Sequence, residues 1–212
     1  MLLSGPDAII ARRRALCRPS MRPLAALACR IRTEIDTPDA AASRVPDADP
    51  MDGGIRAGLL LLLERPGLAA LPAGFVSRDN ATPTARNLRR FLGETGIPRT
   101  RTLIWNVVPW AHPDPARNRS PTRAELAAGL RWLPPLLALL PALRVVVLSG
   151  RPAAAAVPVL AAARPDLPVL LMPHPSPTIV CTSPAVPERI RATLSAAARC
   201  LFPLPTEPTS CP

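Results

Sequence analysis

The chain has 212 residues, enough for one α/β domain with a sizeable core. Its 26 basic residues, all arginine, outnumber 15 acidic residues and give a formal net charge of +11. This charge favours a polyanionic partner such as nucleic acid, although a generally basic proteome would produce the same excess.

Cysteine spacing and hydropathy narrow the class of protein further. The five cysteines are widely spaced and include no Cys-x-x-Cys pair, which argues against a zinc site or a disulfide framework. No apolar run reaches the roughly 18 residues of a membrane span. The arginines at 12–14 follow a short apolar stretch instead of preceding it, unlike those of a signal peptide. We therefore expect a cytoplasmic protein without a membrane partner.

Domain organisation follows from the strength of the patterning. Residues 1–20 are basic and weakly patterned, so we expect them to be disordered or to precede a true start at Met21. A helix is predicted over residues 21–32, because Leu24, Leu27, Ala28 and Ile31 recur at helical spacing. Residues 21–202 are expected to form a single domain, and the proline-rich residues 203–212 a tail.

Four apolar runs predict buried strands over residues 57–64, 101–109, 144–150 and 168–172. The first run is continuously apolar, without alternation, which indicates burial on both faces, as in a parallel sheet covered by helices. Helices are predicted between and after them, over 82–96, from Ser120-Pro121 with a kink at Pro134 and Pro135, over 152–163 and over 184–201, whereas 68–81 reads as a loop. This alternation predicts a three-layer α/β/α sandwich with a central four-stranded parallel sheet.

Ligands of such sheets bind at the carboxyl ends of the strands, which here bring four segments to one edge: residues 64–67, 106–110, 149–150 and 174–177. His174, held between Pro173 and Pro175, is suited to donate to an anion developing on a leaving group. Asn106 interrupts an apolar strand and offers a donor and an acceptor side by side, as reading a base edge requires. The alternatives are a structural histidine and a buried amide bonded to a neighbouring loop.

Other polar and aromatic candidates follow the strands. Glu64 ends the five-leucine run and is placed to orient a water, or else to pair with Arg65 or cap the start of a helix. Ser176 and Ser149 are candidate phosphate contacts, with turn capping as the alternative. Phe75 is a candidate stacking residue or a core residue. No P-loop, Gly-x-Gly-x-x-Gly or nucleophile-elbow pattern is present.

Four motifs in order resemble the uracil-DNA glycosylase superfamily: Leu-Leu-Leu-Glu64-Arg-Pro-Gly67, Asn106-Val-Val-Pro109, Val147-Leu-Ser-Gly150 and His174-Pro-Ser-Pro177. Their order and spacing match that family across roughly residues 55–200. The resemblance implies a base-excision repair glycosylase that hydrolyses the N-glycosidic bond of uracil, or a related deaminated base, flipped out of single- or double-stranded DNA. It further implies a nucleoid-associated monomer.

Residue roles come with the resemblance. Asn106 would pair with the base edge, Phe75 would stack on the base, His174 would stabilise the departing anion and Glu64 would position the water. The remaining base contacts would be Arg65, Pro66 and Gly67. The DNA contacts would be Ser149, Gly150, Arg151, Pro175, Ser176, Pro177 and either Ile179 or Val180 as a wedge in the base stack. No metal or cofactor is implied, because the leaving group is a stabilised anion.

The chain departs from the family pattern at three positions. Leu63 replaces a glycine, and Arg65 replaces a small residue, where a guanidinium would crowd the base or grip a phosphate. Pro109 stands where thermophile-type members place a cysteine ligand of an iron–sulfur cluster, so we predict a cluster-free branch. Two further readings stay open: a nucleic-acid-binding protein that has lost hydrolysis, and a small-molecule α/β enzyme unrelated to DNA.

Overall fold

The computed structural model describes residues 3, 5–35, 44–112, 114 and 119–202, so the predicted tail lies outside the described residues. Its central sheet contains β2 (Leu59–Leu63), β4 (Thr102–Asn106), β5 (Val145–Ser149) and β6 (Val169–Met172). All neighbours are parallel, in the order β4-β2-β5-β6. The predicted four-stranded parallel sheet is confirmed, with strand ends a few residues inside the predicted bounds.

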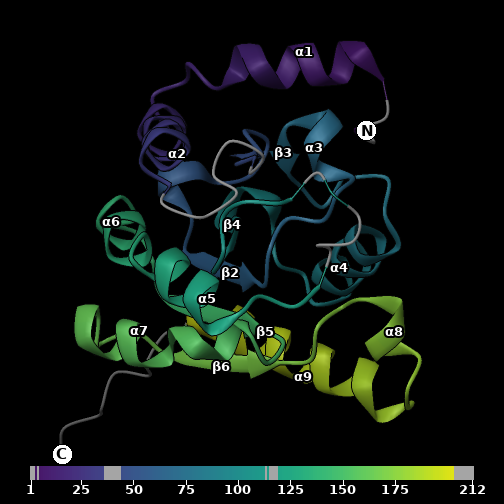
Figure 1. Ribbon diagram of the computed structural model, residues 1–212. Coiled ribbons are helices and arrows are strands. Elements are labelled where there is room, and N and C mark those ends of the chain that lie inside the picture. The colour runs from purple at the N-terminus through teal and green to yellow at the C-terminus, as the bar shows by residue number, and fades with distance from the viewer. Residues whose placement is uncertain (1–2, 4, 36–43, 113, 115–118, 203–212) are drawn as a thin grey trace, which may run out of the picture.

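Helices cover both faces of this sheet (Figure 1). Leu60 and Leu62 of β2 pack toward α2 (Arg22–Glu34), α6 (Leu133–Ala138) and α7 (Val157–Ala163). Leu59 and Leu61 pack toward α4 (Pro83–Glu94) and α9 (Ala185–Leu201) on the other side. Successive side chains of a strand point to opposite faces, so this leucine run must fill two cores. The three-layer α/β/α sandwich is therefore confirmed.

The buried faces predicted for the helices are confirmed where apolar residues recur clearly at helical spacing. All four apolar positions predicted in α2 are buried, as are Ala85, Leu88, Phe91 and Leu92 of α4. Helix α4 begins as predicted, with the Thr82 side chain accepting a hydrogen bond from the Ala85 backbone N–H at 3.1 Å and proline at the first position. In α9, Ile190, Leu194 and Ala197 point inward as predicted.

The helix predicted from Ser120-Pro121 is wrong in two respects. Thr122, not Ser120, caps α5 (Arg123–Leu130), because Thr122 and Glu125 form a reciprocal capping box. Pro134 and Pro135 do not kink one long helix; they lie at the start of a separate helix, α6. The first turn of a helix tolerates proline because its N–H groups need no helical partner.

The segment predicted as a loop at 68–81 contains α3 (Ala70–Ala73) and β3 (Phe75–Val76). Strand β3 pairs in parallel with β1 (Asp47–Ala48), forming a small second sheet. The short 3-10 helices are η1 (Gly54–Arg56), η2 (Arg99–Arg101) and η4 (Ala153–Ala156). Helix α8 (Pro177–Val180) begins at the last proline of the segment 173–177. Elements of two residues lie below the length at which periodicity can reveal them.

The expected disorder of residues 1–20 is wrong for residues 5–20. Residues Pro6–Ala15 form α1, which crosses the top of the molecule in Figure 1 above α3 and β3. Ile9 and Leu16 pack against a small cluster containing Phe75, and Arg12 is buried. Helix α1 is therefore part of the domain. Within the described residues, no helix combines the length and apolar character needed to cross a membrane.

Candidate active site

A cavity of about 420 Å³ opens at the carboxyl ends of the central strands. It brings together Glu64, which follows β2, Asn106, which ends β4, and His174, which follows β6. Arg65, Pro66, Gly67 and Ser176 also line it, so most of the residues predicted at this edge do meet there. Its volume is sufficient for a nucleic-acid base.

Backbone pairing fixes Glu64 and Asn106 beside each other. Asn106 pairs with Leu63 in the β2–β4 register, and the ladder continues beyond both strands. The Val108 N–H donates to the Glu64 carbonyl at 3.0 Å. The Asn106 side chain is only 3% exposed, and its Oδ1 atom has no hydrogen-bond partner within the described structure. A buried acceptor left unsatisfied is costly, so the alternative of an amide bonded to a neighbouring loop through its oxygen is not supported.

His174 is held in one orientation by contacts on several sides. Its Nδ1 atom accepts the Ser176 backbone N–H at 3.2 Å, and Asn87 donates to the carbonyl of Pro175 at 2.9 Å. Gly150, at φ +87°, lies so close that a Cβ there would stand 3.2 Å from the His174 Cβ. Because Nδ1 is an acceptor, the neutral ring carries its proton on Nε2. Burial lowers the pKa of His174 below its ordinary value, which favours this neutral form.

Arg65 does not pair with Glu64. Its Nη2 atom lies 2.8 Å from Oε1 of Glu125, while Arg119 contacts the other carboxylate oxygen of Glu125 at 3.0 Å. Burial opposes ionisation of Glu125, but hydrogen bonds from Arg65, the Thr122 backbone and Arg119 outweigh it and lower its pKa to about 2. The Arg65 side chain is only 6% exposed, so the expected phosphate grip is not supported. The capping carboxylate of α5 holds this guanidinium.

Phe75 is not in this cavity, so its expected place under the base is wrong. Its ring is 1% exposed and packs with Leu3 and Ala73 beneath α1. Its neighbour Val76 lines the cavity instead, with Leu88 and Ile104. Side chains alternate across a strand, so only one of two consecutive residues of β3 can face the cavity.

A second hollow, of about 800 Å³, adjoins the first and shares Glu64, His174 and Ser176 with it. Gly150, Arg151 and Ile179 line it, and Arg151 and Ile179 are exposed. Helix α8 begins at Pro177 and carries Ile179 outward, as a wedge would require. Ser149 differs from expectation, because it is completely buried and lines neither hollow.

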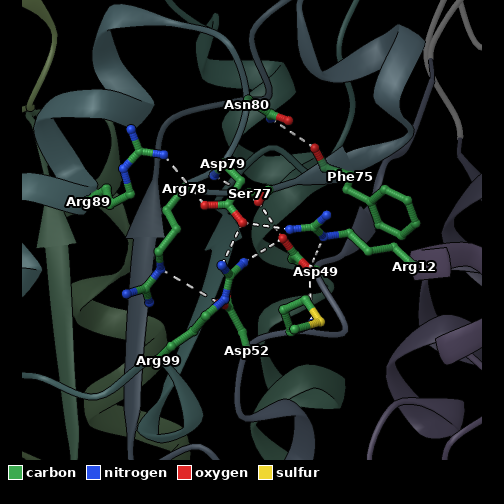
Figure 2. Close-up of polar contacts among 11 residues, drawn as sticks. Arg12, Asp49, Asp52, Phe75, Ser77, Arg78, Asp79, Asn80, Arg89 and Arg99 are labelled. Carbon is green, nitrogen blue, oxygen red and sulfur yellow. Dashed lines mark hydrogen bonds and ion pairs between the residues drawn. The ribbon is translucent and has the colours of Figure 1, made fainter. Parts of the chain in front are cut away.

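A buried ionic cluster, which was not predicted from the sequence, adjoins the cavity through Ser77, and Figure 2 shows its contacts. It comprises Arg12, Asp49, Asp52, Arg78, Asp79 and Arg99, joined by Ser77 and by the partly exposed Arg89. Arg12 of α1 contacts Asp49 at 3.0 Å and Asp79 at 2.5 Å. Arg99 contacts the same two carboxylates at 2.7 and 2.6 Å. Ser77, which donates to Asp49, also lines the cavity.

Burial and the neighbouring charges shift the pKa values of several groups in this cluster. Burial raises the pKa of Asp52 to about 7, against the attraction of Arg78 and Arg99. Burial lowers the pKa of Arg78. Burial opposes the charge of Arg99 too, but the neighbouring Asp52 and Asp49 carboxylates raise its pKa. The only hint in the sequence was a dense polar run, Ser77-Arg-Asp-Asn80, directly after an apolar pair.

The four cysteines that the structure describes do not fit an iron–sulfur cluster. Cys17, Cys29 and Cys181 are exposed, Cys200 is half-buried, and they lie on separate segments of the chain. Among the residues the structure describes, no three His, Cys, Asp or Glu side chains converge as metal ligands. Four cysteine thiolates on neighbouring segments are what such a cluster needs.

Comparison with known proteins bears on the origin of this site. No curated protein matches the chain significantly. The sequence does match the family model described as Uracil DNA glycosylase superfamily over residues 52–197, more than two thirds of the 212 residues. The matched region contains all four motifs, the central sheet and the cavity at its edge. The chain therefore belongs to the uracil DNA glycosylase superfamily, whose members act on DNA.

Proposed function

We propose that this protein is a base-excision repair glycosylase that hydrolyses the N-glycosidic bond of uracil, or a related deaminated base, in DNA. The observation that carries the proposal is the meeting of Glu64, Asn106 and His174 in one cavity of suitable size. Each of them supplies a different function that the reaction needs. The net charge of +11 supports a polyanionic substrate.

The base enters the cavity by flipping out of the strand. The Asn106 amide, at the end of β4, pairs with its polar edge. Val76, Leu88 and Ile104 provide apolar contact that Phe75 does not. Arg151 and Ile179, on the adjoining hollow, contact the backbone and the gap in the base stack.

Cleavage breaks the bond between C1′ of the sugar and the base nitrogen, and the bonding electrons leave with the base. His174 stabilises the resulting anion by donating its Nε2–H, since Nδ1 is occupied by the Ser176 N–H. A neutral imidazole donor suffices because the leaving group is already a stabilised anion. The oxygen of a water held by the Glu64 carboxylate adds to C1′, and its proton passes to that carboxylate. The products are the free base and an abasic sugar.

The test is incubation with single- and double-stranded oligonucleotides that contain one uracil, followed by alkaline cleavage at abasic sites. Wild type is expected to produce cleaved strands. Replacing His174 by alanine should lower the rate about 10²- to 10³-fold, as for loss of a donor to a developing anion. Glu64→Gln should lower it about 10²- to 10⁴-fold.

Glu94→Gln is the matched control, because Glu94 is an exposed glutamate on α4 that pairs with Arg90 and Arg191 and does not line the cavity. Its rate should equal that of wild type. The proposal is wrong if wild type leaves no abasic sites, or if His174→Ala cleaves as fast as wild type. DNA binding that weakens with salt, without any turnover, would instead identify a nucleic-acid-binding protein. Absence of DNA binding would instead identify a small-molecule enzyme.

A further inference from the structure

A hollow of about 620 Å³, separate from the two at the strand ends, is lined by residues of α1, α2, α3, β1 and β3. Figure 1 shows these elements together at the end of the molecule that carries the N-terminal helices. Phe75 of β3 lines this hollow, whereas the next residue, Val76, lines the cavity of the candidate active site. Successive side chains of a strand point to opposite faces, so the hollow and the cavity lie on opposite sides of β3.

The hollow carries more positive than negative charge. Among the described residues, its charged side chains are those of Arg13, Arg32, Arg44 and Asp47. The Nη2 atom of Arg32 lies 2.8 Å from Oδ1 of Asp47, and its Nε donates to the Val45 carbonyl at 2.9 Å. The side chains of Arg13 and Arg44 are exposed and form no ion pair or hydrogen bond with any described residue. One arginine is therefore compensated, and two positive charges remain.

The segments that carry these two charges are held in place. Nη2 of Arg13 lies 3.8 Å from where a Cβ on Gly74 would stand, and the Gly74 carbonyl accepts from the Asp47 N–H at 2.9 Å. Helix α1, which carries Arg13, is anchored by the buried ionic cluster. The Arg44 backbone exchanges two hydrogen bonds with Ala111, at 3.0 and 2.8 Å. A preorganised site binds an anion without a large ordering cost.

The walls and the charge of the hollow indicate the chemistry of its ligand. Like charges on a concave surface with apolar walls strengthen the local field, and here Leu16, Val45 and Leu71 supply such walls. A guanidinium binds phosphate oxygens through paired N–H groups. A phosphate monoester carries about −2 at neutral pH, which matches the two uncompensated arginines, whereas a carboxylate or a phosphodiester carries a single negative charge. The volume leaves room beside the phosphate for a sugar and a base.

We propose that this hollow is a second nucleotide-binding site, in which Arg13 and Arg44 hold a phosphate monoester and the apolar walls contact the nucleoside. The nucleotide is either a free mononucleotide or the 5′-phosphorylated end of a strand. The inference goes beyond the proposed glycosylase function, because none of the lining residues belongs to the candidate active site.

The experiment is calorimetric titration of wild type, Arg13→Gln and Arg44→Gln with deoxyadenosine 5′-monophosphate, deoxyadenosine and inorganic phosphate. The monophosphate should bind wild type, and each substitution should weaken it about tenfold, as for loss of one hydrogen bond to a charged group. Arg14→Gln is the matched control, because Arg14 is an exposed arginine of α1 that does not line the hollow. Its affinity for the monophosphate should equal that of wild type.

The inference is overturned if deoxyadenosine binds as tightly as its monophosphate, or if Arg14→Gln weakens binding as much as Arg13→Gln and Arg44→Gln do. Inorganic phosphate that binds as tightly as the monophosphate would also overturn it, because the apolar walls would then contribute nothing. These measurements need no base excision, so their result is independent of whether the glycosylase proposal holds.

A second titration distinguishes the two sources of the phosphate. It compares one oligonucleotide with a 5′-phosphate and the same oligonucleotide with a 5′-hydroxyl end. Tighter binding of the phosphorylated form, lost in Arg13→Gln, would support the inference with a strand end as the ligand. Equal binding of both forms, together with arginine-dependent binding of the monophosphate, would support it with a free mononucleotide as the ligand.

Discussion

Gly150 is the position where a single added methyl group should disturb His174 most directly. Its φ of +87° is a conformation that alanine adopts only at a cost, about 1–2 kcal/mol. The added Cβ would also stand 3.2 Å from the His174 Cβ, so the histidine must move by a few tenths of an ångström. Misplacement of a reacting group by 1 Å can lower a rate about 10²-fold. We therefore expect Gly150→Ala to lower the excision rate about 3- to 10-fold.

Gly96→Ala is the matched control, because Gly96 also has a positive φ, +66°, but nothing lies within 4 Å of its added Cβ. Both variants should lose about 1–2 kcal/mol of unfolding free energy, measured by urea denaturation, and a few degrees in Tm. Only Gly150→Ala should also lose activity on the uracil oligonucleotide. The reasoning is refuted if both variants lose the same stability and Gly150→Ala excises uracil at the wild-type rate.

Three further outcomes are expected. Arg12→Ala removes a cation from beside the buried carboxylates of Asp49 and Asp79, and it should cost about 3–5 kcal/mol of unfolding free energy measured in urea. Arg164→Ala, which breaks an exposed ion pair, should change the unfolding free energy little. Equal effects would contradict a supporting role for α1. Burial lowers the pKa of His174 below 6.5. The excision rate should therefore stay constant as pH falls past 6.5 and decline only near the lower folded-state pKa, which NMR titration of the ring measures. A midpoint at or above 6.5 would refute this. The folded-state pKa of Glu125, about 2, lies below its ordinary value of 4.5. The difference in unfolding free energy between wild type and Glu125→Gln should therefore be complete above pH 4.5 and disappear as pH falls toward 2. A difference that does not depend on pH would disprove the ion pairing.

The ionic cluster gives the N-terminal helix a part in the site. Arg12 of α1 and Arg99 of η2 hold the two carboxylates that flank the wall formed by Ser77 and Asn80. Two cations and two shared anions compensate one another where a single buried charge would be expensive. The cavity wall therefore depends on segments more than sixty residues apart in the chain.

The local pattern of apolar and polar residues was sufficient to predict the architecture of the sheet and its covering helices. The unbroken run Leu59–Leu63 requires apolar surroundings on both sides, so a covered parallel sheet follows from the sequence alone. The carboxyl ends of parallel strands share one edge, which places Glu64, Asn106 and His174 together before any contact is known. Thr82-Pro83 marks the start of α4 by backbone chemistry that acts within a few residues.

Contacts between distant segments were decided only by the tertiary structure. Arg65 could have turned to Glu64, to a phosphate or to Glu125, and the position of α5 puts Glu125 2.8 Å from its guanidinium. Phe75 and Val76 are both apolar, so pairing of β3 with β1 decides which of them faces the base. Residues 1–20 were expected to be disordered or to precede the true start, because the partners of Arg12, Asp49 and Asp79, lie far from it in the sequence. The sequence by itself determined the sheet and the three residues at its edge, because these follow from local periodicity. Only the folded chain decided the partners of its buried charges, because such pairing depends on where distant segments meet.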